Sequence, residues 1–214
     1  MPEQTTITIA IPKGRVLNQL LPFFDSAGID TSSLRKDGRE LIREDKKNGV
    51  RFLLLKPDDV PTYVEYGASD LGIVGRDVLV ERQYDLLVPL DLGIGVCEMY
   101  VCGKKGTQIE ATGNRPLRVA TKFAYTANEY FRARGIPAET IFVQGSVELA
   151  PLTGLADVIV DLVETGQTLR QNGLVTLEKI SDVSAVLVAN RAAYRLKADR
   201  INALVEKLDR YIRS

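Results

Sequence analysis

Thr165, Gly166 and Thr168 follow a short apolar run and are residue types that can bind a phosphate group. The run, residues 158–160, is β-branched throughout, which is typical of a strand covered on both faces. A junction from a strand to a helix gathers unpaired backbone N–H groups at the positive end of the helix dipole, and glycine lets the backbone approach an anion. The stretch therefore favours a phosphate site, but a helix cap followed by ordinary polar turn residues fits it equally well.

Two acidic residues, Asp161 and Glu164, interrupt the same stretch. Carboxylates repel phosphate, but they accept hydrogen bonds from sugar hydroxyls and can help to hold Mg²⁺. Hydrogen-bond donors suited to a phosphate, beside hydrogen-bond acceptors suited to ribose hydroxyls, suggest that a phosphoribosyl group binds here.

Basic residues stand at a second junction near the start of the chain. An alternating strand over residues 6–11 ends at a proline, and Lys13, Gly14 and Arg15 lead into a helix that Gly28 ends. Because Gly14 keeps the backbone open, the junction favours an anion site. A solvated basic turn is the alternative.

Strands and helices alternate through the first third of the chain, which predicts the α/β class with a parallel sheet. Residues 50–55 and 71–74 form buried strands, and each is followed by a short helix. Sites in open α/β sheets lie outside the carboxyl ends of strands. The basic residues at such ends are Lys13, Arg15, Lys56 and Arg76.

The segment between the first helix and the second strand, residues 30–48, is polar and dense in charge, so we expect a loop with a small hairpin. Its Arg35, Lys36 and Arg39 are placed to reach a phosphate or to form a solvated face, which is the commoner outcome for such a cluster.

The alternation restarts after a hydrophilic stretch that follows residue 103. Before it, two strands are expected. They cover residues 84–89 and 94–102. After it we expect strands over 117–121, 141–143, 158–160, 174–180 and 183–188, and helices over 123–134, 147–151 and 191–213. The last helix presents one apolar stripe that includes Leu196, Ile201, Leu204 and Leu208, as expected of a helix that covers a core.

Composition limits the classes of function. The 28 basic residues balance the 28 acidic ones, so the protein has no net electrostatic field that would attract nucleic acid or an anionic membrane. There is no histidine, which excludes histidine-based catalysis and the usual zinc sites. The absence of a signal-like or spanning apolar segment predicts a cytoplasmic protein. An extended chain separates Cys97 and Cys102 by roughly 16 Å on opposite faces, so we expect buried thiols and no disulfide.

Five motifs resemble the short form of ATP phosphoribosyltransferase, the catalytic subunit that begins histidine biosynthesis. They are P-K-G-R at 12–15, K-P-D-D-V-P at 56–61, D-L-G-I-V-G-R-D at 70–77, G-S-V-E-L-A-P at 145–151 and G-L-A-D-V-I-V-D-L-V-E-T-G-Q-T-L at 154–169. The resemblance implies a two-lobed α/β fold like that of type II periplasmic binding proteins, with the active site in the cleft between the lobes. The N-terminal lobe would comprise residues 1–92 and 181–214, and residues 93–180 would form an inserted lobe carrying the phosphoribosyl-binding loop.

The implied reaction joins N1 of the adenine of ATP to the anomeric carbon of phosphoribosyl pyrophosphate (PRPP) and expels pyrophosphate, with Mg²⁺ shielding the pyrophosphate. Thr165, Gly166, Thr168 and the backbone at Gln167 and Leu169 would hold the 5′-phosphate. Asp161 and Glu164 would face the ribose hydroxyls and, through water, Mg²⁺. The polyphosphates would meet Lys13, Arg15 and Lys56 as the catalytic residues, with Arg39 as a further binding residue. Many relatives have arginine where Lys56 stands, which leaves its contact open.

The resemblance also implies partners. The long form carries a C-terminal regulatory domain that we do not expect here, and the short form assembles with a regulatory subunit similar to histidyl-tRNA synthetase. We therefore expect a homodimer within a hetero-oligomer. Two alternatives remain: a non-catalytic bilobal protein that binds a solute or effector, and a phosphoribosyltransferase acting on a free base, which fits the 157–169 stretch but not the other motifs.

Overall fold

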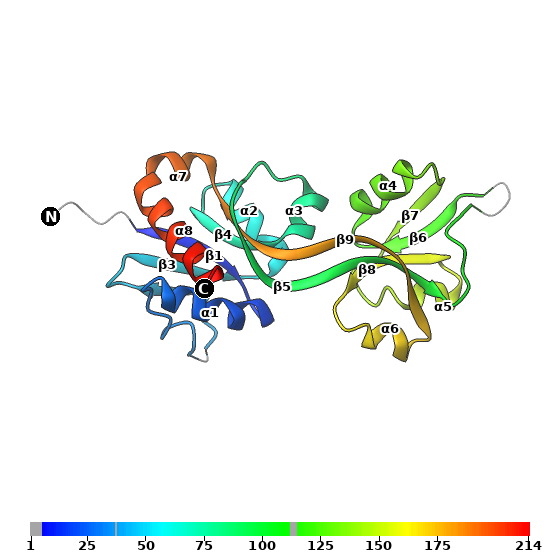
Figure 1. The fold of residues 1–214 in the computed structure, drawn as a ribbon, viewed down its shortest axis with the longest axis horizontal. Coiled ribbons are helices and arrows are strands. Elements are labelled where there is room, and N and C mark those ends of the chain that lie inside the picture. The colour runs from blue at the N-terminus through cyan, green and yellow to red at the C-terminus, as the bar shows by residue number, and fades with distance from the viewer. Residues whose placement is uncertain (1–5, 37, 112–114) are drawn as a thin grey trace. The chain divides into compact units, whose positions relative to one another are not determined.

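The computed structural model describes residues 6–36, 38–111 and 115–214 and is of the predicted α/β class (Figure 1). The chain divides into two compact units. One comprises Met1–Leu79, Gln83–Gly95 and Ser184–Ser214, and the other Val80–Arg82 and Val96–Val183. The predicted lobe ranges also include residues 1–5, 37 and 112–114, which lie outside the described residues.

The strands are β1 (Ile7–Pro12), β2 (Ile42–Asp45), β3 (Val50–Leu55), β4 (Leu71–Gly75), β5 (Leu87–Lys104), β6 (Leu117–Thr121), β7 (Ala138–Phe142), β8 (Val158–Val163) and β9 (Leu174–Ala189). The helices are α1 (Arg15–Ser26), the 3₁₀ turn η1 (Pro57–Asp59), α2 (Val60–Glu65), α3 (Arg76–Arg82), α4 (Ala124–Ala133), α5 (Leu149–Thr153), α6 (Gln167–Gln171), α7 (Arg191–Leu196) and α8 (Ala198–Ile212). Hydrogen-bonded neighbours follow the order β2-β3-β1-β4-β9-β5-β8-β6-β7.

In the unit that holds both termini, β1 runs parallel to β3 and to β4, as the alternation predicts. Strand β2 closes a hairpin on β3, and β9 pairs with β4 in the antiparallel sense. The predicted hairpin in residues 30–48 is therefore confirmed in part, since its second strand is the buried strand β3.

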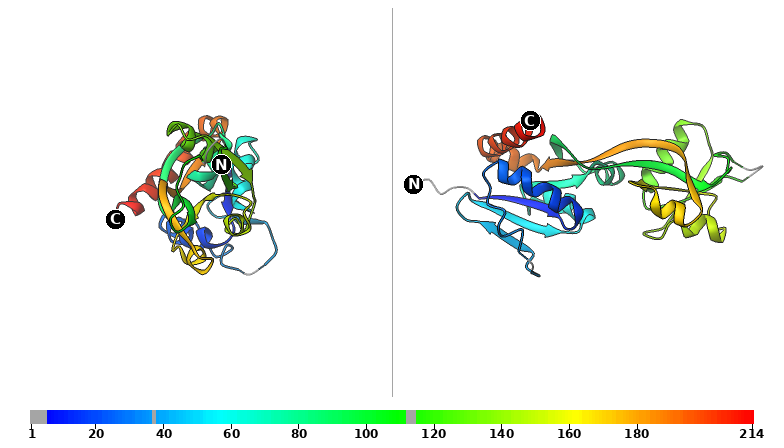
Figure 2. Two further views of the ribbon diagram at one scale, coloured as in Figure 1. Left: turned by 90° about the vertical axis from the view of Figure 1, so that its right-hand side faces the viewer. Right: turned by 60° about the horizontal axis from the view of Figure 1, so that its bottom comes forward.

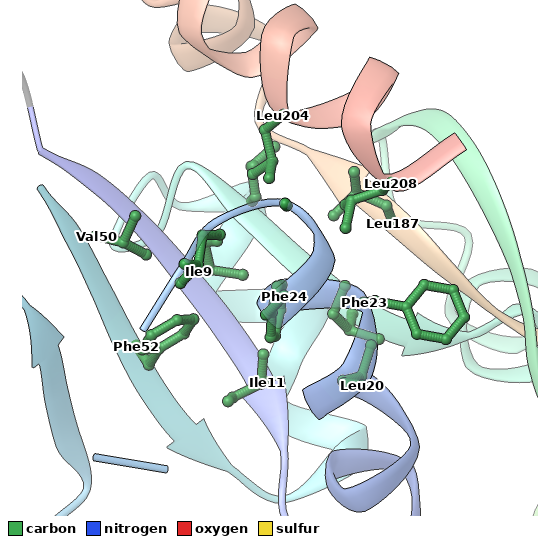
Figure 3. Packing of buried hydrophobic residues seen from close by; sticks show 14 of the residues in the cluster. Ile9, Ile11, Leu20, Phe23, Phe24, Val50, Phe52, Leu187, Leu204 and Leu208 are labelled. Carbon is green, nitrogen blue, oxygen red and sulfur yellow. The ribbon is translucent and has the colours of Figure 1, made fainter. Parts of the chain in front are cut away.

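The core of this unit follows from the alternation of side chains along β1. Ile9 and Ile11 face a cluster closed by α1 and α8, whereas Ala10 faces the opposite cluster under α2 and α3. Figure 3 shows the first cluster, where the rings of Phe24 and Phe52 lie 5.4 Å apart between centroids. Both rings are almost completely buried, so they fix α1 and β3 together.

The C-terminal segment is not one helix, and the prediction of a single helix over residues 191–213 is wrong. It breaks at Lys197 into α7 and α8 (Figure 1). The Lys197 Nζ atom donates hydrogen bonds of 2.8 Å to both carboxylate oxygens of Asp70 and to the carbonyl of Thr6. Leu196, expected in the apolar stripe, is 85% exposed because the stripe starts afresh in α8 with Ile201.

Replacing Lys197 with methionine should lower the free energy of unfolding by about 2 kcal/mol, because it strands a largely buried Asp70 carboxylate. Lys46→Met, at an exposed lysine of the same unit, is the matched control and should change it by less than about 0.5 kcal/mol. Urea unfolding followed by circular dichroism measures both. Equal stability of the Lys197 variant and the wild type would show that this ion pair does not stabilise the fold.

In the other unit, β6 pairs in parallel with β7 and β8, and β8 pairs in the antiparallel sense with β5. Helix α4 covers one face, and α5 and α6 cover the other (Figure 2). The two cysteines are free. Cys97 packs on the α4 side and Cys102 on the α5–α6 side, as their spacing predicts, although Cys97 is only half-buried.

Two pairs of predicted strands are each one continuous strand, so both predicted breaks are wrong. Gly93 and Gly95 have positive φ angles of 63° and 61°, and they bend β5 without ending its pairing. In β9 the side chain of Asp182 is exposed and pairs with Lys179, so its charge does not interrupt the strand. Smaller shifts affect β7, which starts at Ala138, α5, which spans Leu149–Thr153, and β8, which continues to Val163.

Throughout the described ranges, no helix is both long and apolar enough to cross a membrane.

Candidate active site

A pocket of about 280 Å³ opens where β8 gives way to α6. Strand β8 does not end at Val160, as the sequence suggests, but carries Asp161 on to Val163 before the chain turns. The pocket is lined by Glu148, Asp161, Leu162, Val163, Glu164, Thr165, Gly166, Gln167, Thr168 and Leu169. All seven residues predicted from this stretch therefore line one cavity.

The turn into α6 depends on Gly166, whose φ of 66° and ψ of 12° lie in the left-handed region. Gln167 N donates to Thr165 Oγ1 over 3.3 Å, which ties the turn to the threonine. The side chain of Leu169 is buried in the cluster beneath α5 and α6. The backbone N–H groups in the first turn of α6, which have no partner inside the helix, are thus held beside the pocket.

The Asp161 carboxyl is half-buried in β8 and accepts a hydrogen bond of 2.8 Å from Leu162 N. Burial raises the pKa of Asp161, and the negative charge of Glu148 raises it further, while the Leu162 hydrogen bond and the positive charge of Lys122 act in the opposite direction. A carboxylate in these surroundings gains from hydroxyl donors, because they replace the water that burial removes.

The sequence reasoning missed two residues of this site. Glu148 lines the pocket and belongs to the G-S-V-E-L-A-P motif. The glycine of that motif follows a predicted strand, and this was the sequence signal that could have indicated a site residue there. Lys122 directly follows β6, and the parallel pairing of Ala120 with Ile159 brings it level with Asp161. A lysine at a strand end was the same signal that singled out Lys56.

The pocket suits a divalent cation that arrives with a substrate. Among the residues the structure describes, no group of three or more Asp, Glu, Cys or His side chains is arranged to hold a metal ion. Three carboxylates, Glu148, Asp161 and Glu164, nevertheless line the pocket. Mg²⁺ keeps several waters and is commonly held by one or two carboxylates together with substrate phosphates, so the donor set fits such an ion.

Basic residues gather at one edge of the sheet in the other unit. Pro12 pairs with Leu55, and Lys13 N donates to the Leu55 carbonyl over 2.9 Å, so Lys13 and Lys56 follow neighbouring strand ends. Both side chains are exposed. Gly14, with φ of 98°, turns the chain into α1, which begins with the exposed Arg15. This edge therefore presents three cations beside an open backbone turn.

Arg39 belongs to the same edge because β2 runs antiparallel to β3. Ile42 pairs with Leu53, so the residues just before β2 lie at the carboxyl end of β3, where Lys56 follows. The adjacent Arg76, which follows β4, binds Asp91 over 3.0 Å. Burial opposes ionisation of Asp91, but hydrogen bonds from Gly93, Ser184 and Arg76 hold its pKa below the usual range. Asp91 therefore offsets the positive charge of Arg76. It does not offset the charge of Lys13 or Lys56.

Residues 56–210 match the model of the family described as ATP phosphoribosyltransferase (HisG). The chain belongs to the ATP phosphoribosyltransferase family. It is 52% identical over 202 residues to an ATP phosphoribosyltransferase of Sorangium cellulosum, with 94% of each protein covered. The corresponding enzyme of Caldanaerobacter subterraneus is 48% identical, with 94% of this chain and 95% of that protein covered.

A solved structure is also similar, the ATP phosphoribosyl transferase (HisG:HisZ) complex from Thermotoga maritima. The TM-score is 0.81 at 33% identity, with 97% of this chain and 99% of that chain covered. These relatives confirm the predicted family, its enzyme class and its α/β fold. They give no support to a non-catalytic binding protein.

Proposed function

We propose that this ATP phosphoribosyltransferase binds the phosphoribosyl group of PRPP in the pocket at the end of β8. The enzyme transfers that group to N1 of the adenine of ATP, which gives N1-(5-phosphoribosyl)-ATP and pyrophosphate in the first step of histidine biosynthesis. The observation that carries the proposal is the pocket lining itself, where hydroxyl and backbone N–H donors lie beside three carboxylates, two half-buried and one exposed.

The 5′-phosphate would lie against the turn at Gly166. Thr165 and Thr168 would donate through their hydroxyls, and Gln167 and Leu169 through their backbone N–H groups. At the strand side of the pocket, Asp161, Glu148 and Glu164 would accept hydrogen bonds from the ribose hydroxyls. The donors and acceptors lie at different ends of the pocket, and this orients the substrate. In the reverse orientation the phosphate would face the carboxylates and the ribose hydroxyls would lie at the turn, which is unfavourable.

The basic edge of the other unit would hold the polyphosphates. Lys13, Arg15 and Lys56 would contact pyrophosphate or the triphosphate of ATP as the catalytic residues, and Arg39 would add a binding contact. As the bond from the anomeric carbon to the pyrophosphate oxygen breaks, positive charge develops on the sugar and negative charge on the leaving group. Fixed cations at the leaving group stabilise that separation.

We further propose Mg²⁺ as the divalent ion. It would arrive on PRPP, reduce the charge of the pyrophosphate, and contact Asp161 or Glu164 through water. The bond to the anomeric carbon is formed by a neutral ring nitrogen, so a strong base is not needed at that step. The lack of histidine in the chain is consistent with this chemistry.

The direct test of the activity mixes the protein with ATP, PRPP and Mg²⁺ and follows the adduct at N1 by ultraviolet absorbance and mass spectrometry. We expect an adduct that requires both substrates and that is lost when a chelator removes the metal. The regulatory subunit is added in a second arm. No adduct in either arm, from protein that unfolds cooperatively, would contradict the proposal.

Thr168→Ala should weaken PRPP binding about tenfold and leave ATP binding within about twofold, because it removes one hydroxyl donor to a charged phosphate. Thr165→Ala should act in the same direction. Isothermal titration with each substrate measures both affinities. The matched control is Thr176→Ala, at an exposed threonine of β9 outside the pocket lining, which should change neither. An unchanged PRPP affinity in both pocket variants would remove the threonines from the site.

We propose that the chain acts as a short-form catalytic subunit. It would form a homodimer and assemble with a regulatory subunit similar to histidyl-tRNA synthetase, since a similar structure is that of a HisG:HisZ complex. Residues 1–92 and 181–214 would then form the lobe for polyphosphate, and residues 93–180 the lobe for the phosphoribosyl group. A cytoplasmic location follows from its substrates, ATP and PRPP. Co-purification from cells identifies the partner subunit.

A further inference from the structure

The pocket at the end of β8 has no cation in its lining. Its charged residues are Glu148, Asp161 and Glu164, and no lysine or arginine is among the residues that line it. The 5′-phosphate of PRPP carries about −1.5 to −2 charges at neutral pH, as a phosphate monoester does. Three acids and a phosphate in one small cavity repel each other, so binding requires positive charge nearby. The positive charge of Lys122 acts on Asp161 at the strand side of the pocket. A second cation, at the turn of Gly166, would offset the charge of the phosphate.

Arg170 supplies a charge at the required place. It lies in α6, four residues after Gly166, so both residues are on the same side of the helix. Its Nη1 atom lies 3.2 Å from the point where a Cβ atom on Gly166 would stand. The guanidinium group is thus folded back over the turn that carries the phosphate donors Thr165 and Thr168.

Arg170 differs in its pairing from the other arginines of the 96–183 stretch of this unit; Arg82, the remaining arginine of the unit, is exposed and belongs to α3. Between residues 96 and 183 the others each bind a carboxylate. The pairs are Arg115 and Arg118 with Asp157, Arg132 with Glu129, and Arg134 with Glu178. For Arg170, no carboxylate in the described ranges lies within ion-pair distance. Its side chain is exposed and its charge is not offset.

We infer that Arg170 is a further substrate-binding residue, which contacts the 5′-phosphate of PRPP from the α6 side of the pocket. This inference rests on the proposed placement of the phosphoribosyl group. A guanidinium presents paired N–H donors in a planar fork and matches two phosphate oxygens, whereas a lysine offers a point charge. The absence of a side chain at Gly166 leaves the space in which the guanidinium lies.

The test compares Arg170→Gln, Arg170→Lys and a matched control, Arg132→Gln. Arg132 is an exposed arginine of α4 in the same unit, and it pairs with Glu129 outside the pocket. Isothermal titration of the full-length protein with Mg²⁺ measures the dissociation constants for PRPP and, separately, for inorganic pyrophosphate. We expect Arg170→Gln to weaken PRPP about tenfold to a hundredfold and pyrophosphate less than twofold. Arg170→Lys should recover part of the loss, and the control should match the wild type.

The outcomes separate this inference from the proposed function. If the wild type forms the N1 adduct while Arg170→Gln binds PRPP like the wild type, the inference is overturned and the function stands. If the Gln variant weakens PRPP and pyrophosphate equally, Arg170 acts on the leaving group or on the fold, which also overturns the inference. If the wild type forms no adduct, the function itself fails. Should Arg170→Gln not unfold cooperatively, the Lys variant decides, with an unchanged PRPP affinity counting against the inference.

Discussion

Asp161→Asn should lower kcat/KM for PRPP about a hundredfold, which corresponds to about 2.7 kcal/mol of transition-state stabilisation. The substitution keeps the shape of the side chain but removes the negative charge that would bind the ribose hydroxyls and face the developing positive charge of the sugar. The KM for ATP should change less than twofold. Steady-state rates with each substrate varied in turn measure the effect.

The same residue predicts a dependence on pH. Burial first, and then the charge of Glu148, raise the pKa of Asp161, so this carboxylate gains its proton at a higher pH than an exposed aspartate, whose pKa is about 3.9. Because the charged form binds substrate, kcat/KM for PRPP should fall as pH decreases towards that raised value. The acid limb should be absent from the asparagine variant. The control is Asp182→Asn, since Asp182 is exposed and lies outside the pocket lining.

Lys13→Ala should lower kcat and kcat/KM together by about a hundredfold, because its ammonium group is placed to stabilise charge that develops on the leaving pyrophosphate only in the transition state. Lys46→Ala is the matched control. Lys46 follows β2, at the opposite end of the strands from Lys13, and should leave both constants unchanged.

A loss confined to KM would contradict the role given to Lys13, because it would show equal binding of the ground and transition states. Lys13→Arg should retain part of kcat, since charge is preserved while the position of the donor shifts. Rates of the Arg and Ala variants that are equal and low would show that the exact position of the ammonium matters more than its charge.

Much of the site was predictable because it uses local signals. A β-branched run followed by Thr165 and Gly166 predicts a strand and a tight turn, and the structure has both. Lys13 and Lys56 each follow a strand, and parallel pairing places them side by side. Such signals need only the residues within a few positions along the chain.

Other parts depend on partners that are distant in sequence. Arg39 reaches the basic edge only because β2 runs antiparallel to β3, and Glu148 reaches the pocket because α5 packs on β8. Nothing within a few residues of either one encodes those contacts. At the break between α7 and α8, Lys197 likewise pairs with Asp70, more than one hundred residues away. Helical periodicity alone predicts an unbroken helix there.

Continuous strands were missed for a related reason. Gly93 and Gly95 are typical of turns, yet in β5 their positive φ angles bend a strand whose neighbours remain paired. In β9 the polar residues 181–182 predict two separate strands, because the sequence does not show which face is exposed. Pairing with neighbouring strands, rather than local propensity, decides both cases.

The most direct measurement is a crystal structure of the protein with PRPP and Mg²⁺ bound. We expect the 5′-phosphate within hydrogen-bond distance of the backbone N–H groups at Gln167 and Leu169 and of the hydroxyls of Thr165 and Thr168. We also expect the ribose hydroxyls to face Asp161. A 5′-phosphate bound instead at Lys13 and Lys56, with the pocket at the end of β8 empty, would contradict the proposed phosphoribosyl site.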